Sequence, residues 1–237
     1  MSSEAETSHQ REPDPRPLRD FTPDPDVMAR IRAMQYCDAE RVAELHQAAM
    51  GESLWARLGR RFLIEVYRGL IDDPRFLGFV YEEEEGIRGF VAGTLDGSAM
   101  MSGVFRERVF GLAVAMVPGL LRDPFAMRPL FETAFYFDRS GDTVRAESLF
   151  CSFEPDLRGK RVSGHINKVL FDELLARGHS HVKVTTERSN EGANRQLLSW
   201  GFVEDGAFRF YGKDMVRYVL DLERCERVAP VSRHPMV

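Results

Sequence analysis

Cysteine is scarce in this sequence, and the few cysteines are not spaced for pairing or for metal binding. Only three occur, Cys37, Cys151 and Cys225, with no C-x-x-C pair among them. An odd number of widely spaced cysteines fits neither a disulfide framework nor a thiolate zinc site. Four histidines also lack metal-ligand spacing to other ligand residues: His46, His165, His179 and His181. We therefore predict no metal site and a reducing compartment, the cytoplasm.

Long apolar runs and an excess of positive charge are missing as well. The longest apolar stretch, Val109 to Leu121, is too short to span a bilayer and contains Pro118. The opening MSSEAETSHQ has neither the basic nor the apolar region of a secretory signal. The 37 acidic residues outnumber the 32 Lys and Arg residues, giving a net charge of −5, which argues against a nucleic-acid partner. We expect a cytoplasmic protein without a membrane span.

An acidic, proline-rich segment precedes the rest of the chain. Residues 1–26 hold seven acids against three bases, and five of the twelve prolines. Such a segment buries too little apolar surface to offset the entropy lost on ordering it. With a length of 237 residues favouring one large domain, we predict a disordered tail over 1–28, a single domain over 29–223 and a C-terminal tail over 224–237.

Helical and strand periodicities alternate along the domain. Strand patterns occur at 31–35, in a hairpin over 76–97 that turns at Glu85 and Gly86, and at 146–153, 181–187, 208–212 and 215–222. Helical patterns follow Asp38 and occupy 54–70, 162–177 and 190–200. Strands that alternate with helices in the second half imply a crossover and a mixed sheet. The predicted fold is α/β, one domain with a mixed, mostly antiparallel sheet flanked by helices.

Residues 98–144 look like a helical insertion before the strand that begins at Ala146. Large apolar residues recur at helical spacing over 104–121 and 124–137, with breaks at Pro118–Gly119 and at Asp123–Pro124. Three interpretations stay open: a lid over an acceptor site, the contact of a homodimer, or additional core packing. On the first interpretation, Phe135, Tyr136 and Phe137 would line an acceptor pocket.

The stretch most informative about chemistry runs from Ser148 to Gly178. A buried strand passes through Pro155 into Arg158, Gly159 and Lys160, and then directly into a helix. A helix start presents unpaired N–H groups and the positive end of the helix dipole, so it can bind a phosphate. The alternative is an ordinary solvated loop with several bases.

This segment resembles the core of the GNAT superfamily of N-acetyltransferases, which reads V-x-P-x-x-R-G-K-G-x-G/A. The matching residues are Phe153, Pro155, Arg158, Gly159 and Lys160. A second motif of the family, N-x-x-A followed by G-F, is matched by Asn190, Ala193, Gly201 and Phe202. The order of elements from Ile31 to Leu222 also agrees, so the resemblance covers most of the chain.

The resemblance implies a site for acetyl-CoA or another acyl-CoA as co-substrate. The strand 146–153 would splay from the strand 181–187, often through a β-bulge, with the pantetheine arm in the gap and the thioester beside Cys151 and Phe153. The loop 158–164 would hold the pyrophosphate. The implied cofactor-binding residues are Cys151, Phe153, Arg158, Gly159, Lys160, Arg161, Val162, Ser163, Gly164 and Asn190.

Three residues depart from the family pattern. Arg161 replaces a glycine and Ser163 a G/A position, which crowds the approach of the backbone to phosphate. Leu197 stands where a tyrosine commonly protonates the leaving thiolate. Because a thiolate is a tolerable leaving group, that loss slows turnover without forbidding it, and Ser199 or water could substitute.

Glu147 is the residue we expect to act as the catalytic base. It lies six residues before Phe153, the spacing of the general-base glutamate in the histone-acetyltransferase branch of the superfamily. The alternative is a strand glutamate paired with Arg145 or Lys183. Cys151 could be a nucleophile, but it has no recognisable histidine partner, and a small thiol in an apolar strand is usually part of the core.

Two functions follow from these residues. The first is an N-acetyltransferase or N-acyltransferase that moves an acyl group from acyl-CoA to an amine, by direct attack in a ternary complex. A small-molecule amine is the expected acceptor, since members of the superfamily differ in the loops around a shared donor site. The second is a non-catalytic acyl-CoA-binding or regulatory module, which the residues at positions 161, 163 and 197 favour.

Overall fold

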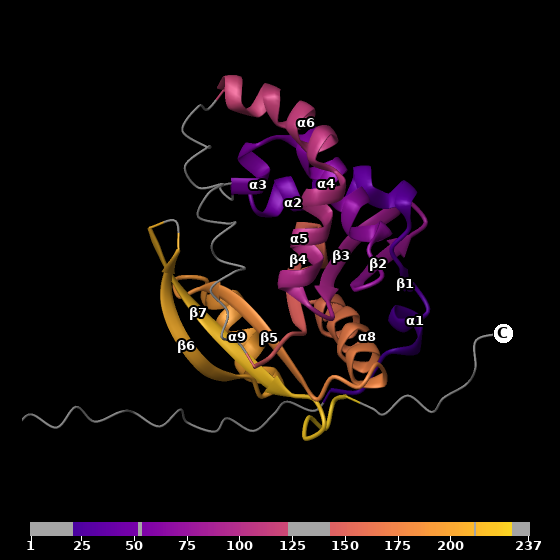
Figure 1. Cartoon of the computed structure of the whole chain (residues 1–237). Helices are drawn as coiled ribbons and strands as arrows, with labels where there is room; N and C mark the ends of the chain where they lie inside the picture. Colours follow the sequence, from indigo (N-terminus) through magenta and orange to yellow (C-terminus); the bar gives the residue numbers. More distant parts are fainter. Residues whose placement is uncertain (1–20, 52–53, 123–142, 211, 229–237) are drawn as a thin grey trace, which may run out of the picture.

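One sheet of seven strands, with helices on both faces, forms the body of the molecule (Figure 1). The computed structural model describes residues 21–51, 54–122, 143–210 and 212–228. The strands are β1 (Ile31–Ala33), β2 (Phe76–Glu83), β3 (Gly86–Thr94), β4 (Glu147–Phe153), β5 (His181–Glu187), β6 (Val203–Phe210) and β7 (Lys213–Asp221). The helices are α1 (Pro25–Met28), α2 (Ala39–Ala49), α3 (Leu54–Arg57), α4 (Arg60–Asp72), α5 (Gly97–Glu107), α6 (Val109–Arg122), α8 (Val162–Ala176) and α9 (Glu191–Trp200), with short 3-10 turns η1 (Tyr36–Asp38) and η3 (Pro155–Leu157).

The strands are ordered β1-β2-β3-β4-β5-β7-β6 across the sheet. Only β4 and β5 run parallel, joined by the crossover through α8, and each of the other neighbouring pairs is antiparallel. A parallel pair needs such a long connection, whereas antiparallel neighbours can follow one another through short turns. The predicted α/β fold with a mixed, mostly antiparallel sheet is confirmed.

Successive residues of the central strand β3 serve two separate cores. Phe90 is buried on the face covered by α2, α4, α5 and α6, where it packs with α4 residues such as Val66. Val91, the next residue, is buried on the opposite face against α8, with Ile166 and Leu170. Side chains alternate across a strand, so one apolar run can supply both faces of a covered sheet.

Several helix boundaries differ from the sequence prediction because of single residues. Gly59, at φ +98°, divides the predicted helix 54–70 into α3 and α4. In the insertion, Asp96 caps α5 by accepting a hydrogen bond from the amide of Ala99, so that helix starts before the predicted residue 104.

The break predicted at Pro118–Gly119 is absent, and α6 runs through Pro118. Its packing explains this, because a Cβ on Gly119 would lie only 2.4 Å from the carbonyl oxygen of Leu58. Close packing against the start of α4 therefore outweighs the low helix propensity of proline. The predicted helix 124–137 and the residues Phe135, Tyr136 and Phe137 lie outside the described residues.

Residues 21–28 differ from the tail expected over 1–28. The centroid of the Phe21 ring lies 5.0 Å from that of His165 and 5.7 Å from that of Trp200. Helix α1 begins after its N-cap residue, Asp24. Phe21 therefore packs at the edge of the core under α8. The composition of residues 1–28 does not indicate this contact. Residues 1–20 lie outside the described part of the chain.

The end of the described chain also packs on the domain. Cys225 and Val228 are 8% and 7% exposed and belong to the core under α8, whereas the sequence placed residues 224–237 in a tail. Residues 229–237 are outside the described part. Within the described residues, each helix is too short or too polar to cross a membrane.

Candidate functional site

Strands β4 and β5 separate shortly after they begin. Their ladder contains only the pairs Glu147 with Lys183 and Ser148 with Val184. On the other side of β4, the register with β3 shifts, so that Ala92 pairs with Phe150 and Gly93 with Ser148. Leu149 is therefore the extra residue of a β-bulge, which bends the strand at the point where the two strands part.

From Leu149 onward, the separation leaves one edge of β4 without a partner among the described strands. Buried backbone N–H and C=O groups require hydrogen-bond partners, so this edge is suited to an extended amide-bearing ligand. Cys151 and Phe153, which the sequence analysis placed beside the thioester, lie along this same stretch. The gap between β4 and β5 begins at the bulge residue Leu149, two residues before Cys151.

Cys151 has the properties of a lining residue. Burial raises the pKa of its thiol to about 12, and its sulfur lies 3.8 Å from the side-chain nitrogen of Asn167. A thiol that holds its proton so firmly is a poor nucleophile at neutral pH. Phe153 lies over Gly89 on β3, where a Cβ would be 2.1 Å from its ring. Both residues face the side of the sheet that α8 covers.

The loop from Arg158 to Gly164 leads from η3 into the start of α8. Arg158, Lys160 and Arg161 are exposed, and in the described residues neither Arg158 nor Arg161 forms an ion pair with an acid. The amides of Val162 and Ser163, in the first turn of α8, have no acceptor among the described groups. Unpaired first-turn amides, the positive end of the helix dipole and nearby cations are the groups that a phosphate or diphosphate requires.

The backbone conformation at Arg161 explains why the GNAT pattern has glycine at this position. Its backbone has φ +60°, and within the described residues it is the one non-glycine residue with positive φ. This left-handed conformation places Arg161 at the N-cap of α8, and its carbonyl accepts a hydrogen bond of 3.0 Å from the amide of Gly164. A residue other than glycine is strained in this backbone conformation.

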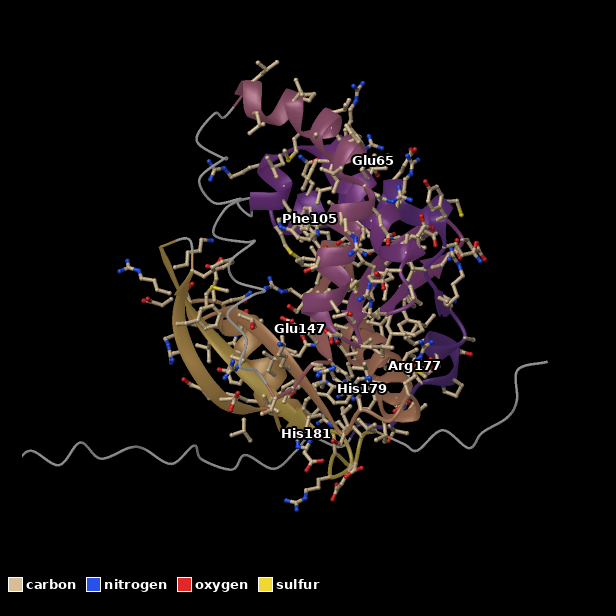
Figure 2. All side chains as sticks on the ribbon, viewed as in Figure 1. Glu65, Phe105, Glu147, Arg177, His179 and His181 are labelled. Atoms are coloured by element: carbon tan, nitrogen blue, oxygen red, sulfur yellow. The ribbon has the colours of Figure 1, made fainter. Side chains whose placement is uncertain are left out.

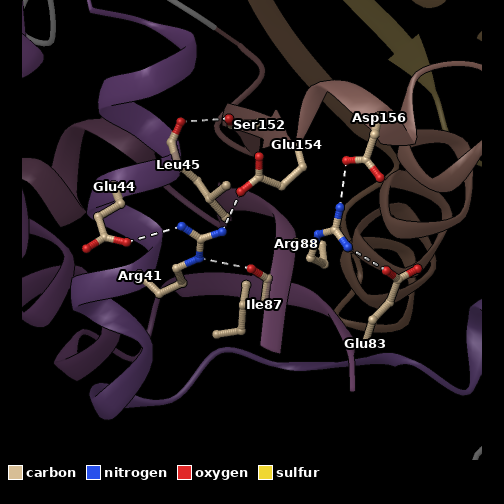
Figure 3. Close-up of polar contacts among 9 residues, drawn as sticks. All are labelled: Arg41, Glu44, Leu45, Glu83, Ile87, Arg88, Ser152, Glu154 and Asp156. Atoms are coloured by element: carbon tan, nitrogen blue, oxygen red, sulfur yellow. Dashed lines mark hydrogen bonds and ion pairs between the residues drawn. The ribbon is translucent and has the colours of Figure 1, made fainter. Parts of the chain in front are cut away.

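Two arginines outside the motif hold the turn between β4 and this loop (Figure 3). Arg41 on α2 donates to Glu154 and, over 3.0 Å, to the carbonyl of Ile87. Arg88 on β3 donates to Asp156 over 2.6 Å and to Glu83 over 3.0 Å. The sequence analysis missed both arginines, because their partners lie in distant strands and turns.

Glu147 lies at the start of β4, where the two strands still pair. It is only 6% exposed and stands opposite Thr94 of β3. The ammonium nitrogen of Lys183, itself 8% exposed, is 3.8 Å from its carboxylate. Figure 2 shows Glu147 in the interior, away from His179 and His181 near the start of β5. Of the two cations suggested as partners for Glu147, Lys183 is the one that pairs with it.

The residues of the second motif serve mainly to build α9. The side chain of Asn190 caps the helix by accepting a hydrogen bond of 3.2 Å from the amide of Ala193. Asn194 donates to the carbonyls of Glu187 and Arg188, while its side-chain oxygen is buried with no described partner. The sequence analysis did not single out this buried, unpaired acceptor.

Leu197, at the position of the family's tyrosine, packs against the core under α8 and offers no proton. The hydroxyl of Ser199, suggested as a substitute, donates to the carbonyl of Gln196 over 2.7 Å. Neither of these two residues is therefore placed as a general acid.

A buried histidine lies beneath β4 on the face opposite α8. His46 of α2 is fully buried, its Nδ1 is 2.7 Å from the hydroxyl of Tyr67, and its ring meets Phe150 edge-on at 4.9 Å. Burial lowers its pKa to about 4, so it is neutral at physiological pH. Trp55 also contacts Phe150 at 5.1 Å. These rings support the strand directly beside the bulge.

His165 and His181 contact backbone and side-chain groups of neighbouring elements. His165 lies between the amide of Asp24 and the carbonyl of Arg161, at 2.9 and 2.8 Å. His181 is near Ser180 and Asp221 at the edge of the sheet. Across the described residues, His, Cys, Asp and Glu side chains form no group of three or more with the geometry of a metal site.

Comparison with known proteins identifies the fold. No family model matches the chain, and a search of curated proteins gives no match. Among solved structures, the ribosomal-protein-S18-alanine N-acetyltransferase of Escherichia coli aligns at a TM-score of 0.51 and 14% identity, covering 81% of this chain and 92% of that one.

Two further solved structures agree. A putative acetyltransferase of the GNAT family from Desulfovibrio desulfuricans aligns at a TM-score of 0.51 and 10% identity, covering 81% of this chain and 98% of that one. A spermidine N-acetyltransferase chimera from Vibrio cholerae and hSSAT aligns at 0.51 and 16% identity, with coverages of 81% and 95%. These alignments show that the chain has the GNAT fold, as the motif resemblance implied.

Proposed function

We propose that this protein transfers an acyl group from acyl-CoA, in the simplest case acetyl from acetyl-CoA, to an amine. One observation carries the proposal: the free edge of β4 beyond the Leu149 bulge leads directly to the cationic loop at the start of α8. An extended amide-bearing arm with a diphosphate at one end matches both parts of this surface. The GNAT fold of solved N-acetyltransferases agrees with it.

The donor would lie in the gap between β4 and β5. Backbone groups of β4 from Leu149 to Phe153 would pair with the pantetheine amides and polarise the thioester carbonyl. The amides of Val162 and Ser163 would bind the diphosphate with Arg158, Lys160 and Arg161. Asn190, already engaged as a helix cap, would approach the cofactor arm only through its remaining hydrogen-bonding capacity.

The acyl transfer needs a base and a leaving group. The amine nitrogen forms a bond to the thioester carbon, the carbon–sulfur bond breaks, and the electron pair leaves on the CoA sulfur. The amine gives up a proton to Glu147, directly or through water, and water protonates the thiolate. The ammonium of Lys183, at 3.8 Å, stabilises the negative charge of Glu147 and so favours the form that can accept a proton.

A small-molecule amine in the cytoplasm is the acceptor we propose. The net charge of −5 gives no general attraction for a polyanionic acceptor. The solved structures of the same fold include one named for spermidine and one named for the alanine of ribosomal protein S18, so the fold alone does not select between a small molecule and a protein as acceptor.

The test follows thiol release from acetyl-CoA and propionyl-CoA in the presence of a panel of polyamines, amino acids, aminoglycosides and short peptides. Acceptor-dependent release of CoA, with the acylated amine identified by mass spectrometry, is the expected result. Saturable binding of CoA without acceptor-dependent release would instead indicate the non-catalytic module, which the missing acid at Leu197 favours. Failure to bind any CoA thioester would contradict both functions.

A further inference from the structure

Helix α6 has an apolar surface on all sides, although described residues cover only one of them. No charged residue occurs between Val109 and Leu121. Leu112 and Ala115 are 3% and 8% exposed, and they pack against the core of α4. A helix that is apolar all round is typically buried all round. The sequence of α6 therefore predicts a partner on its outer side, where the described residues place none.

The outer side carries a continuous row of large apolar residues. Phe110, Val114, Val117 and Leu121 have exposed fractions of 86%, 73%, 50% and 81%. Elsewhere in the described chain, exposed large apolar residues are scattered singly, as at Tyr36, Leu198 and Val203. We call the four residues on α6 the outer row. A contiguous exposed apolar row of this kind marks an interaction surface.

The intervals between the residues of the outer row are the same when the row is read in either direction. Its residues are separated by four, three and four positions, the alternation of a two-helix seam. Read backwards, the row gives the same intervals, so two antiparallel copies bring Phe110 onto the partner's Leu121 and Val114 onto the partner's Val117. A surface that complements itself in this way closes as a two-fold pair.

We propose that α6 pairs with α6 of a second copy of this chain, antiparallel, about a two-fold axis between residues 115 and 116. The exposed charges next to the start of α6 do not oppose this direction, because Arg106 and Glu107, whose side chains are 81% and 75% exposed, lie 4.0 Å apart and compensate each other.

The pair is independent of the proposed function and does not require a ligand. One helix on each side buries less than the roughly 800 Å² per partner of a standard interface, so the dimer should form in the micromolar range and dissociate on dilution. A lipid surface is a less suitable occupant, because the net charge of −5 is repelled by anionic headgroups.

Sedimentation of the full chain over a wide concentration range tests the proposal. Wild type should shift from monomer to dimer, and Val114→Glu should weaken the dimer at least tenfold, since it places a carboxylate against the partner's Val117. Val203→Glu is the matched control, because Val203 is 66% exposed and lies on β6. A wild type that stays monomeric, or a Val114→Glu dimer of unchanged strength, overturns the proposal.

Disulfide trapping tests the register in a Cys37→Ser background, which removes the exposed cysteine. A mixture of Val114→Cys and Val117→Cys chains should form a covalent dimer faster than either variant alone. Equal or faster trapping of Val114→Cys alone overturns the antiparallel register. Co-sedimentation of a monomeric wild type with phosphatidylcholine vesicles would show a lipid occupant, and a monomer that binds no vesicles would indicate cover by residues 123–142. Both results reject the second copy.

Discussion

The guanidinium of Arg88, on β3, donates a hydrogen bond of 2.6 Å to the carboxylate of Asp156, in the turn η3 that precedes the loop proposed to bind diphosphate. This contact holds the pKa of Asp156 below its usual range. The ammonium of Lys160 lies 3.6 Å from the same carboxylate. Arg88 therefore neutralises an acid that would otherwise compete with phosphate for Lys160.

The first prediction concerns this competition. Arg88→Met should weaken CoA binding about threefold to tenfold, because Asp156 then engages Lys160 more strongly, a modest effect for exposed charges. Adding Asp156→Asn should restore the affinity, since no acid then remains to compete. Isothermal titration with CoA measures both variants. An Asp156→Asn change that fails to rescue would mean that Arg88 acts only on the shape of the turn.

A second prediction tests the strained N-cap of α8. Arg161→Gly removes a left-handed side chain and should raise the free energy of unfolding by about 1 kcal/mol. It should also weaken CoA binding, because a cation is lost from the phosphate site. Arg161→Ala serves as the control, since it loses the charge and keeps the strain. Unchanged or tighter CoA binding by Arg161→Gly would show that the charge does not compensate for the missing glycine.

The third prediction uses the buried histidine. The pKa of His46 is about 4 in the folded protein, against about 6.5 in the unfolded chain. As the pH falls, His46 is therefore protonated in the unfolded state before it is protonated in the folded state. The contribution of neutral His46 to the free energy of unfolding is complete above pH 6.5 and is lost as the pH falls toward 4. The loss amounts to about 3 kcal/mol.

Urea unfolding from about pH 7.5 to pH 4.5 measures this dependence. His46→Gln should be less stable than wild type at neutral pH, and the difference should shrink as the pH falls. Other acids titrate equally in both proteins, so the difference between the two curves isolates His46. Parallel curves would contradict the assignment of a neutral, buried imidazole.

The fourth prediction addresses the proposed base. Glu147→Gln should lower the rate of acyl transfer about 100-fold or more near neutral pH, while CoA affinity stays within a few-fold. The amide keeps the size of the side chain but cannot accept the proton of the amine. Glu84→Gln, at the exposed end of the β2–β3 hairpin, is the control. Wild-type turnover of Glu147→Gln across the pH range would remove Glu147 from the mechanism.

Lys183 gives the fifth prediction. Lys183→Met removes the side-chain nitrogen that lies 3.8 Å from the carboxylate of Glu147, and it leaves a buried carboxylate without this partner. The free energy of unfolding should therefore fall by about 3 kcal/mol, whereas Lys183→Arg, which keeps a positive charge, should lose less. Urea unfolding measures both variants. A Lys183→Met protein as stable as wild type would mean that the ion pair makes no net contribution to stability.

Local signals in the sequence determined much of this protein. The hairpin turn, predicted at Glu85 and Gly86, lies one residue earlier, at Glu84 and Glu85. This turn, the cap at Asn190 and the helix stops at Gly178 and Gly201 all depend on residues within a few positions of one another. The alternation over 181–187 predicted β5 to the residue. Short-range hydrogen bonds and side-chain periodicity set these elements, and both can be read along the chain.

Tertiary structure decided where the chemistry is placed. The bulge at Leu149 and the end of the β4–β5 ladder at Ser148 depend on the register between strands that are far apart in sequence. The same pairing put Lys183, rather than Arg145, beside Glu147. Packing against Leu58 carried α6 through Pro118, because contacts from a distant helix outweigh a local preference. A linear pattern can name the residues of this site, but only the folded sheet selects their partners.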